Sequence, residues 1–198
     1  MERRPRSRDV PAISLGDPPI GEDEVSASET NNEGRREKMT RDKLDCGVIF
    51  ALRILIGWTF LYAGAWQILQ SFDTAGFLDH VVTFHGFFAH FADPAVLPYT
   101  DFLVKWGHLL IGLSLVSGLL VRVSGPFGIL LMITYYFAHM QWPFIEDHTN
   151  LFVDFHIVYA VAIVFLIAHR AGHVWGLDGV AARLPAVENN NILKSLVD

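Results

Sequence analysis

The sequence predicts an all-α membrane protein, a bundle of four transmembrane helices with an extra amphipathic or re-entrant segment between the first and second spans. Three observations predict this fold class. Hydrophobic residues make up 52% of the 198 positions and charged residues only 18%, where soluble domains carry about 25% charged residues. Four stretches are long and apolar enough to cross a bilayer, which takes about 20 residues. The segments on either side of these stretches alternate between ones that contain lysine or arginine and ones that contain neither.

The first 45 residues differ from the rest of the chain. They hold 11 of the 21 acidic residues and 9 of the 15 lysines and arginines. A polar segment with few aromatic side chains cannot bury enough surface to fold, so residues 1–45 are predicted to be a disordered cytoplasmic tail. A basic cluster at residues 35–43 precedes the first apolar stretch and favours the anionic lipids of the cytoplasmic leaflet.

The four predicted spans lie in one domain, residues 46–180. They are residues 46–69, 102–121, 123–145 and 151–169. Gly57 and Gly64, seven residues apart in the first span, predict a stripe of small residues along which a second helix packs closely. Residues 181–198 are predicted to be a short cytoplasmic C-terminal tail.

Positive charge orients these spans. Five of the eleven residues before the first span are lysine or arginine, and the connections 70–101 and 146–150 contain none. Arg122 lies in the turn between the second and third spans, and three more basic residues follow the fourth. Because positive charge marks the cytoplasmic side, the protein is expected to be a multi-pass protein of the cell membrane with both termini in the cytoplasm.

The connection over residues 71–101 is strongly aromatic but interrupted by aspartates and histidines. It is too polar for a fifth span, which would also break the charge alternation. We therefore expect an amphipathic helix or re-entrant segment at the outer leaflet, with a partly ordered loop as the alternative. His80, His85 and His90 would point about 140° apart on a helix, so no metal site is predicted there.

Polar side chains recur at one depth in the outer half of the predicted bundle. At a rise of about 1.5 Å per residue, His108, His139 and His156 each lie about 8–9 Å from the outer ends of their spans. Asp154 and Lys105 lie about 5 Å from theirs. Ionisable groups inside spans are costly and usually face the protein interior. The matching depths therefore predict one polar site inside the bundle.

This polar layer suits a quinone. Neutral histidine and tyrosine can donate hydrogen bonds to quinone carbonyls, and aspartate or lysine can relay protons. Imidazole changes charge near pH 6.5 and so can change roles at working pH. The predicted catalytic residues are His108, His139, Asp154 and His156, and the predicted binding residues beside them are Tyr62, Gln67 and Lys105. Two alternatives stay open: these side chains only anchor or satisfy the helices, or two of the histidines ligate haem b.

Composition also excludes several classes of protein. A net charge of −6 and a pI near 5.8, with no basic face, exclude a nucleic-acid-binding protein. Cys46 is the only cysteine, which excludes an internal disulfide and an iron–sulfur cluster ligated by cysteines of this chain alone.

Three motifs follow one another through the predicted membrane domain. They are Leu52-Arg53-Ile54-Leu55-Ile56-Gly57 leading to Ala63-Gly64, Gly112-Leu113-Ser114-Leu115 leading to Gly118-Leu119 and Arg122, and His173-Val174-Trp175-Gly176-Leu177-Asp178. In order and spacing they resemble the DoxX/DoxD family of small four-helix membrane proteins. The family often carries lysine after the first span's glycine, where this chain has Gln67.

The resemblance implies four transmembrane helices over roughly residues 46–180 and a link to membrane quinone. The best-known members of the family are DoxD-type subunits of thiosulfate:quinone oxidoreductase, which act with a partner subunit. The expected function is therefore that of an integral subunit of a quinone-linked oxidoreductase, with thiosulfate as one candidate donor. An extracytoplasmic or membrane partner would deliver the electrons, and a homo-oligomer is compatible with the sequence. The alternative is a non-catalytic membrane scaffold or assembly factor.

Overall fold

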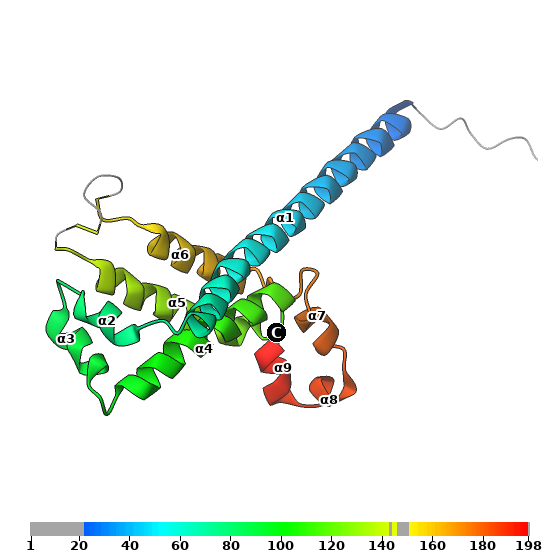
Figure 1. Ribbon diagram of the computed structural model, residues 1–198. Helices are drawn as coiled ribbons and strands as arrows, with labels where there is room; N and C mark the ends of the chain where they lie inside the picture. The colour runs from blue at the N-terminus through cyan, green and yellow to red at the C-terminus, as the bar shows by residue number, and fades with distance from the viewer. Residues whose placement is uncertain (1–21, 143, 146–150, 198) are drawn as a thin grey trace, which may run out of the picture. The chain divides into compact units, whose positions relative to one another are not determined.

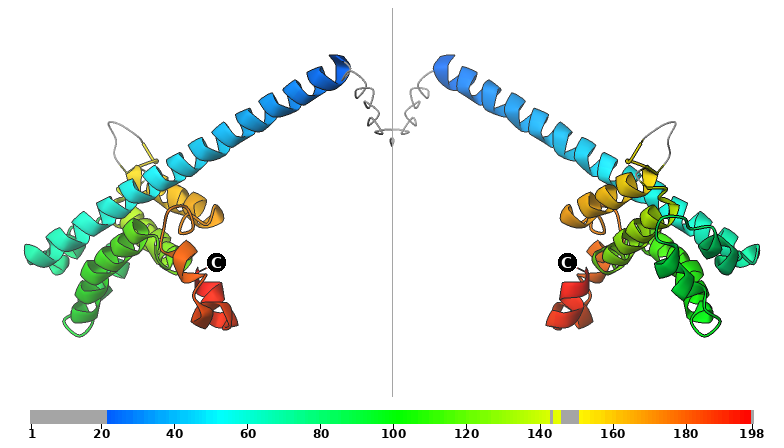
Figure 2. Two further views of the ribbon diagram at one scale, coloured as in Figure 1. Left: turned by 90° about the vertical axis from the view of Figure 1, so that its right-hand side faces the viewer. Right: turned by 90° about the vertical axis from the view of Figure 1, so that its left-hand side faces the viewer.

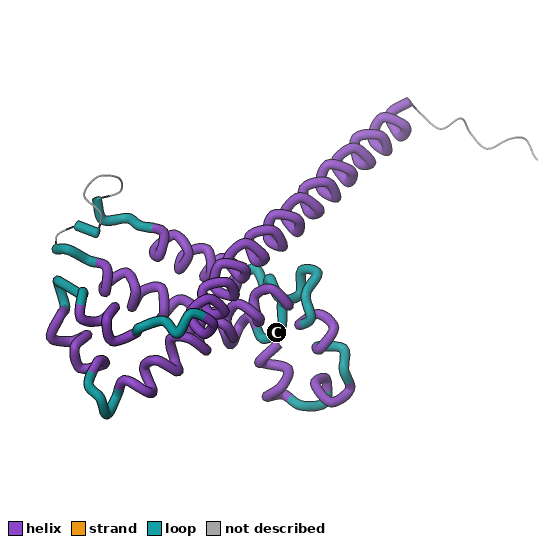
Figure 3. The backbone as a smooth tube through the Cα atoms, in the orientation of Figure 1, coloured by secondary structure: helices purple, strands orange, loops and turns teal. Residues whose placement is uncertain are grey.

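The computed structural model describes residues 22–142, 144–145 and 151–197, with side chains described from residue 32 onward. In these residues all regular secondary structure is helical apart from one isolated bridge between Gln141 and Phe144 (Figure 3), which confirms the predicted all-α class. The connection 146–150 lies outside the described residues. The chain divides into two compact units, Met1–Asp42 and Lys43–Asp198, and the second begins close to the predicted boundary at residue 46.

Helix α1 spans Glu22–Leu69. The prediction of a disordered tail is therefore wrong for residues 22–45. Residues 33–43 are rich in glutamate, arginine and lysine, which are good helix formers. Glu37 precedes Arg41 by four residues, the spacing at which opposite charges support a helix. Composition predicted disorder because such a segment buries little surface, yet a charged helix needs no burial to form local hydrogen bonds.

Three further long helices belong to the second unit: α4, Leu97–Ser117; α5, Val121–His139; and α6, Phe155–Ala168. Among the described residues, two helices are long and apolar enough to cross a membrane, the part of α1 at Asn32–Leu69 and α5. Helix α6 is apolar but has only 14 residues. The predicted four-span bundle stays a prediction.

The helix ends follow local backbone signals. Helix α4 ends at Ser117 because the next residue, Gly118, has a φ of 68°, in the left-handed region that glycine adopts without strain. Leu120 follows with φ 57°, and α5 starts at the next residue. Helix α5 ends at His139, six residues before the predicted end of its span. Helix α6 starts at Phe155 because the Asp154 side chain caps it.

A buried core joins α1, α4, α5 and α6, and α5 and α6 lie side by side (Figures 1 and 2). Its fully or nearly buried members include Ile56, Phe60, Leu115, Val121, Ile163 and Leu166. Glycines bring α1 and α4 into close approach. A Cβ atom on Gly64 would lie 2.4 Å from the backbone nitrogen of Leu109, and one on Gly112 would lie 2.3 Å from that of Leu61. The glycine stripe on α1 therefore faces another helix, as the sequence predicts.

The connection between α1 and α4 folds into short pieces rather than one amphipathic helix. They are α2, Thr74–Asp79; α3, His85–Ala89; and the 3-10 helix η1, His90–Ala92. Asp73 caps α2 by accepting a hydrogen bond from the backbone of Gly76 at 3.0 Å. A small second core of Leu78, Val81, Phe88 and Ala138 packs this segment against the end of α5.

The predicted C-terminal tail is also folded. It contains α7, Asp178–Ala181; α8, Pro185–Glu188; and α9, Asn191–Val197. Nε2 of His173 lies 2.7 Å from the backbone oxygen of Val197. This contact ties α9 back to the segment that precedes α7.

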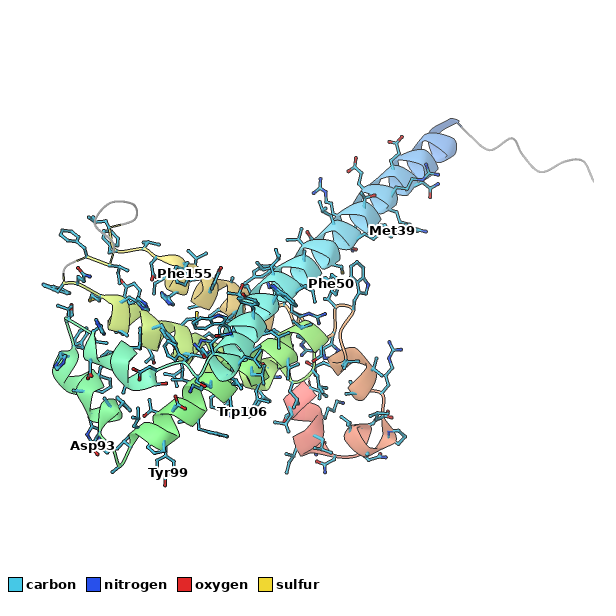
Figure 4. The ribbon with its side chains drawn as sticks, viewed as in Figure 1. Met39, Phe50, Asp93, Tyr99, Trp106 and Phe155 are labelled. Atoms are coloured by element: carbon cyan, nitrogen blue, oxygen red, sulfur yellow. The ribbon has the colours of Figure 1, made fainter. Side chains whose placement is uncertain are left out.

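Large apolar side chains cover the outward faces of the long helices. Tyr99 and Trp106 project away from the bundle along α4 (Figure 4). Trp58 on α1, Phe127 on α5 and Val161 on α6 are likewise exposed. Exposed apolar surface of this extent marks an interaction with lipid or another protein.

Candidate functional site

A cavity of about 330 Å³ lies within the second unit, and we call it the histidine cavity. Helices α1, α4, α5 and α6 each contribute side chains to its lining, and Phe72 and Phe77 close it from the connection after α1. Its larger polar lining residues are Gln67, His108, Tyr135, His139, His156 and Tyr159. Four helices therefore aim hydrogen-bonding groups at one small space.

The structure brings together five of the residues predicted to share a site. Four of them line the cavity: His108, His139, His156 and Gln67. Asp154 does not line it but contacts the ring of His156. All but His139 are buried. His139 is exposed and so lies at the mouth of the cavity. The three histidines that the sequence puts at one depth thus lie around one cavity.

Tyr62 and Lys105 lie outside the histidine cavity, which corrects their prediction as flanking residues. Tyr62 is 62% exposed, because the cavity-facing side of α1 carries Phe60, Ala63 and Gln67 instead. Lys105 pairs with Asp101, one helical turn earlier, at 2.9 Å. The distance of a residue from the end of its span predicts how deep the side chain lies in the membrane. The direction in which the side chain points depends instead on its position around the helix.

Asp154 caps the N-terminus of α6 and also orients the ring of His156. Its Oδ1 accepts hydrogen bonds from the backbone nitrogens of His156 at 3.1 Å and Ile157 at 3.3 Å. Its Oδ2 lies 2.5 Å from Nδ1 of His156. Two residues apart in a regular helix, Asp154 and His156 would point about 200° apart. Asp154 is instead the N-cap and lies outside the regular helix, so its carboxylate reaches the His156 ring.

The hydrogen-bond partners of the three histidines determine which ring nitrogen carries a proton. Nδ1 of His108 lies 2.7 Å from the carbonyl oxygen of Val104, and Nδ1 of His139 lies 2.9 Å from that of Tyr135. Nδ1 of His156 faces the Asp154 carboxylate. Carbonyl and carboxylate oxygens only accept, so each ring is assigned a proton on Nδ1.

This tautomer corrects one expectation from the sequence. In a neutral ring with the proton on Nδ1, the other nitrogen, Nε2, is an acceptor. Neutral His108 and His139 therefore cannot donate a hydrogen bond to a quinone carbonyl from Nε2. A histidine in this cavity therefore donates from Nε2 only when both of its ring nitrogens are protonated.

Tyr135 contacts all three histidine rings, although it is not among the site residues predicted from the sequence. Its ring centroid lies 5.4 Å from that of His108 and 5.8 Å from that of His156, with the His156 ring parallel to it within 1°. The signal in the sequence is its spacing of four residues before His139, which puts both on one face of α5. Tyr159, three residues after His156, follows the same rule on α6.

Gln67 lines the cavity and also carries a fully buried acceptor. The residue is only 8% exposed. Its Oε1 atom has no hydrogen-bond partner among the described residues. A buried polar atom without a partner costs about 1–3 kcal/mol.

A long apolar groove of about 930 Å³ adjoins the histidine cavity. It follows the space between α4 and α5, which diverge toward α2 and α3 (Figure 1). Phe72, Phe77 and Tyr135 line both the groove and the cavity. The described residues contain no group of three or more histidine, cysteine, aspartate or glutamate side chains that could hold a metal ion.

A second polar cluster lies elsewhere in the same unit, and we call it the Arg53–Asp178 clamp. Arg53 is 1% exposed, and it donates to the backbone oxygens of Ala171 at 2.9 Å and Trp175 at 3.3 Å. Phe50, one turn earlier on α1, packs edge-on against Trp175. Arg53 thus fastens α1 to the segment before α7.

Asp178 completes the clamp. Its carboxylate accepts from the backbone nitrogens of Leu120 at 2.7 Å and Val121 at 3.2 Å, where α5 begins. Burial raises the pKa of the Asp178 carboxyl above its ordinary value, and these two hydrogen bonds and the charge of Arg53 offset part of that shift. Asp178 therefore takes the role of a cap for α5.

All three motifs that resemble the DoxX/DoxD family contribute to this clamp. Arg53 comes from the first motif, Gly118 from the second and Asp178 from the third. A Cβ atom on Gly118 would lie 2.7 Å from Cα of Gly176, so the second and third motifs are in direct contact. The resemblance itself stays a prediction from the sequence. No protein-family model, no curated protein and no solved structure matches this chain.

Proposed function

We propose that the chain is a membrane-embedded subunit of a quinone-linked oxidoreductase and that the histidine cavity holds the quinone ring. The observation that carries this proposal is the convergence of three imidazoles, two tyrosines and an amide on one cavity of about 330 Å³. That volume suits a small ring, because ligand pockets run from about 300 to 1,000 Å³. A flat ring can stack on the aromatic walls while its two oxygens meet the polar groups.

The membrane location rests on the helices. Two apolar helices of sufficient length and the exposed apolar faces of α4 and α6 support a bundle in lipid. In this proposal α4 and α6 are the second and fourth spans. The exposed apolar residues at 151–153 extend the apolar length of α6 beyond its 14 helical residues. The alternating positive charge puts both termini in the cytoplasm.

The residues of the cavity can manage the protons of quinone reduction, which adds two electrons and two protons to yield the quinol. The Asp154 carboxylate stabilises a protonated His156, which can then give the proton on Nε2 to one quinone oxygen. Its Nδ1–H stays bonded to Asp154 throughout, so the ring keeps its orientation. The Tyr135 hydroxyl donates a hydrogen bond to the other oxygen and passes the second proton to it. His139, exposed at the mouth, is placed to pass a replacement proton from water.

The electrons come from outside this chain. Cys46 lies 21 residues before Gln67 on α1, or about 31 Å along the helix axis, so no cysteine of this chain handles sulfur in the cavity. A partner subunit on the extracytoplasmic side would oxidise the donor, and thiosulfate is the donor that the resemblance to DoxD-type subunits implies. The adjoining apolar groove supports a quinone over a free polar ligand, because membrane quinones carry an apolar chain.

The test is direct binding of a short-chain ubiquinone analogue to the purified protein in lipid nanodiscs, followed by intrinsic tryptophan fluorescence. Replacing His156 by glutamine or Tyr135 by phenylalanine removes one hydrogen bond and should weaken binding about tenfold, the equivalent of about 1.4 kcal/mol. The matched control is His169→Gln, because His169 is exposed directly after the end of α6 and does not line the cavity. Equal binding by all three variants, or no binding by the unaltered protein, would favour the scaffold function instead.

A further inference from the structure

The apolar groove beside the histidine cavity runs along one face of α4 and one face of α5. Its lining residues on α4 recur at the spacing of one helix face from Thr100 to Ser117, and those on α5 do so from Leu120, just before the helix, to Ala138. At a rise of about 1.5 Å per residue, the α4 face is about 25 Å long. The hydrocarbon core of a bilayer is about 30 Å thick. The groove is therefore long enough to hold an extended hydrocarbon chain over most of that thickness.

The lining of the groove favours an apolar occupant. None of the described residues that line it is charged. Ser117 and Thr134 donate hydrogen bonds to backbone oxygens one turn earlier in their own helices. Ser114 and Ser124 pair with each other between the two helices. A polar ligand would lose its hydration in this groove without gaining hydrogen bonds in return, whereas a hydrocarbon chain loses nothing.

The groove and the histidine cavity meet at three aromatic residues. Phe72, Phe77 and Tyr135 line both spaces. Tyr135 lies 15 residues after Leu120, so about 22 Å of the groove extends from the cavity toward Leu120 and the end of α4. Residues of the connection between α1 and α4 line the other, shorter end. A molecule with its ring in the cavity therefore has room for a long apolar chain beside it.

We propose that this groove holds the isoprenoid chain of a quinone whose ring lies in the histidine cavity. The inference rests on the proposed function and adds the substrate class, a quinone with a long isoprenoid chain. A chain that leaves the bilayer for the groove exchanges one apolar environment for another, so its burial adds little affinity. The groove instead determines where the chain lies, and the test must measure position.

The experiment is photo-crosslinking on the full-length protein in lipid nanodiscs. The probe is a ubiquinone with a diazirine at the far end of an isoprenoid chain that spans about 22 Å. After irradiation and digestion, mass spectrometry should find the label on groove residues near the end of α4 and the start of α5: Ser117, Leu120, Val123 and Phe127. An excess of a chainless ubiquinone analogue should reduce this labelling at least fivefold, because it displaces the ring that anchors the probe.

A pair of variants tests the path of the chain. Gly107 lines the groove, and a Cβ atom there meets nothing within 4 Å. Gly107→Leu therefore fills the groove without a clash and should reduce labelling near Leu120 at least fivefold, while binding of the chainless analogue changes less than twofold. Gly47→Leu is the matched control, since Gly47 on α1 is equally open and does not line the groove. It should change neither value.

The outcomes separate this inference from the proposed function. Label spread over the exposed faces of all the long helices, with the chainless analogue still bound, would overturn the chain site and leave the quinone site intact. Labelling of the groove that the chainless analogue does not displace would show that the groove takes lipid chains independently of the ring, which also overturns the inference. Failure of the unaltered protein to bind the chainless analogue would overturn the proposed function, and the inference with it.

Discussion

The close approach of α1 and α4 predicts a large difference between two glycine-to-alanine substitutions on the same helix. Gly112 and Gly107 both lie in α4. A Cβ atom on Gly112 would lie 2.3 Å from the backbone nitrogen of Leu61, where ordinary contact begins at 3.4 Å, whereas one on Gly107 meets nothing within 4 Å. To accept Gly112→Ala, the two helix backbones must separate by about 1 Å.

The magnitude follows from two opposing effects. Alanine in place of glycine favours a helix by about 1 kcal/mol, and this gain applies to both positions. Overpacking a tight contact costs about 1–3 kcal/mol, and the upper end applies at Gly112 because backbone atoms cannot rotate away as a side chain can. Gly107→Ala should therefore match or exceed the unaltered protein in stability. Gly112→Ala should be less stable than Gly107→Ala by about 3 kcal/mol.

Thermal unfolding in mild detergent, followed by circular dichroism, measures this difference. For a chain of this size about 3 kcal/mol corresponds to a melting temperature lower by roughly 6–12 °C. Because both substitutions are in one helix and make the same chemical change, the helix-propensity gain cancels in the comparison. Equal melting temperatures for the two variants would refute the close packing of α1 against α4.

Three further predictions concern topology, the clamp and the segment before α4. Reporter fusions after Asp93 and after Asp198 should report opposite sides of the membrane, and the same side for both would contradict the orientation. Asp178→Ala leaves two backbone N–H groups at the start of α5 without acceptors and should lower the free energy of unfolding in denaturant titrations by at least about 2 kcal/mol, whereas Asp79→Ala, at an exposed position, should change it by less than about 0.5 kcal/mol. Phe88→Ala empties the second core at a cost of about 3–5 kcal/mol, so hydrogen exchange should accelerate across α2 and α3; unchanged exchange there would show that this core does not hold the segment.

Hydropathy and charge predicted the helical class and the approximate places of the long helices. They could not locate the helix ends, because a single side chain decides each end. The Asp154 carboxylate starts α6 four residues later than the apolar stretch does, and the left-handed backbone of Gly118 stops α4. The same reasoning missed the helix over residues 22–45, since composition reports on burial and not on local helix propensity.

The sequence predicted the depth of the candidate site residues but not the directions in which their side chains point. Counting residues from the span ends put His108, His139 and His156 at one depth, and the structure places all three around one cavity. The count could not separate Gln67, which lines the cavity, from Tyr62, which is exposed on α1. That distinction depends on how α1 is rotated against α4, and the glycine contacts determine the rotation. The protonated nitrogen of each histidine likewise depends on which carbonyl or carboxylate oxygen lies beside it.

The Arg53–Asp178 clamp limits what the resemblance to the DoxX/DoxD family can imply about the ligand. Every motif that carries the likeness to the DoxX/DoxD family contributes to the clamp, and Arg53, Gly118 and Asp178 are all absent from the lining of the histidine cavity. Proteins recognised by these motifs would share a device that holds three chain segments together, whatever molecule they bind. Relatives sharing a ligand should instead be sought by the pattern Gln67, His108, Tyr135, His139 and His156, whose members are spread over four helices. A search by the motifs groups proteins by how they are assembled, and a search by the cavity pattern would group them by what they do.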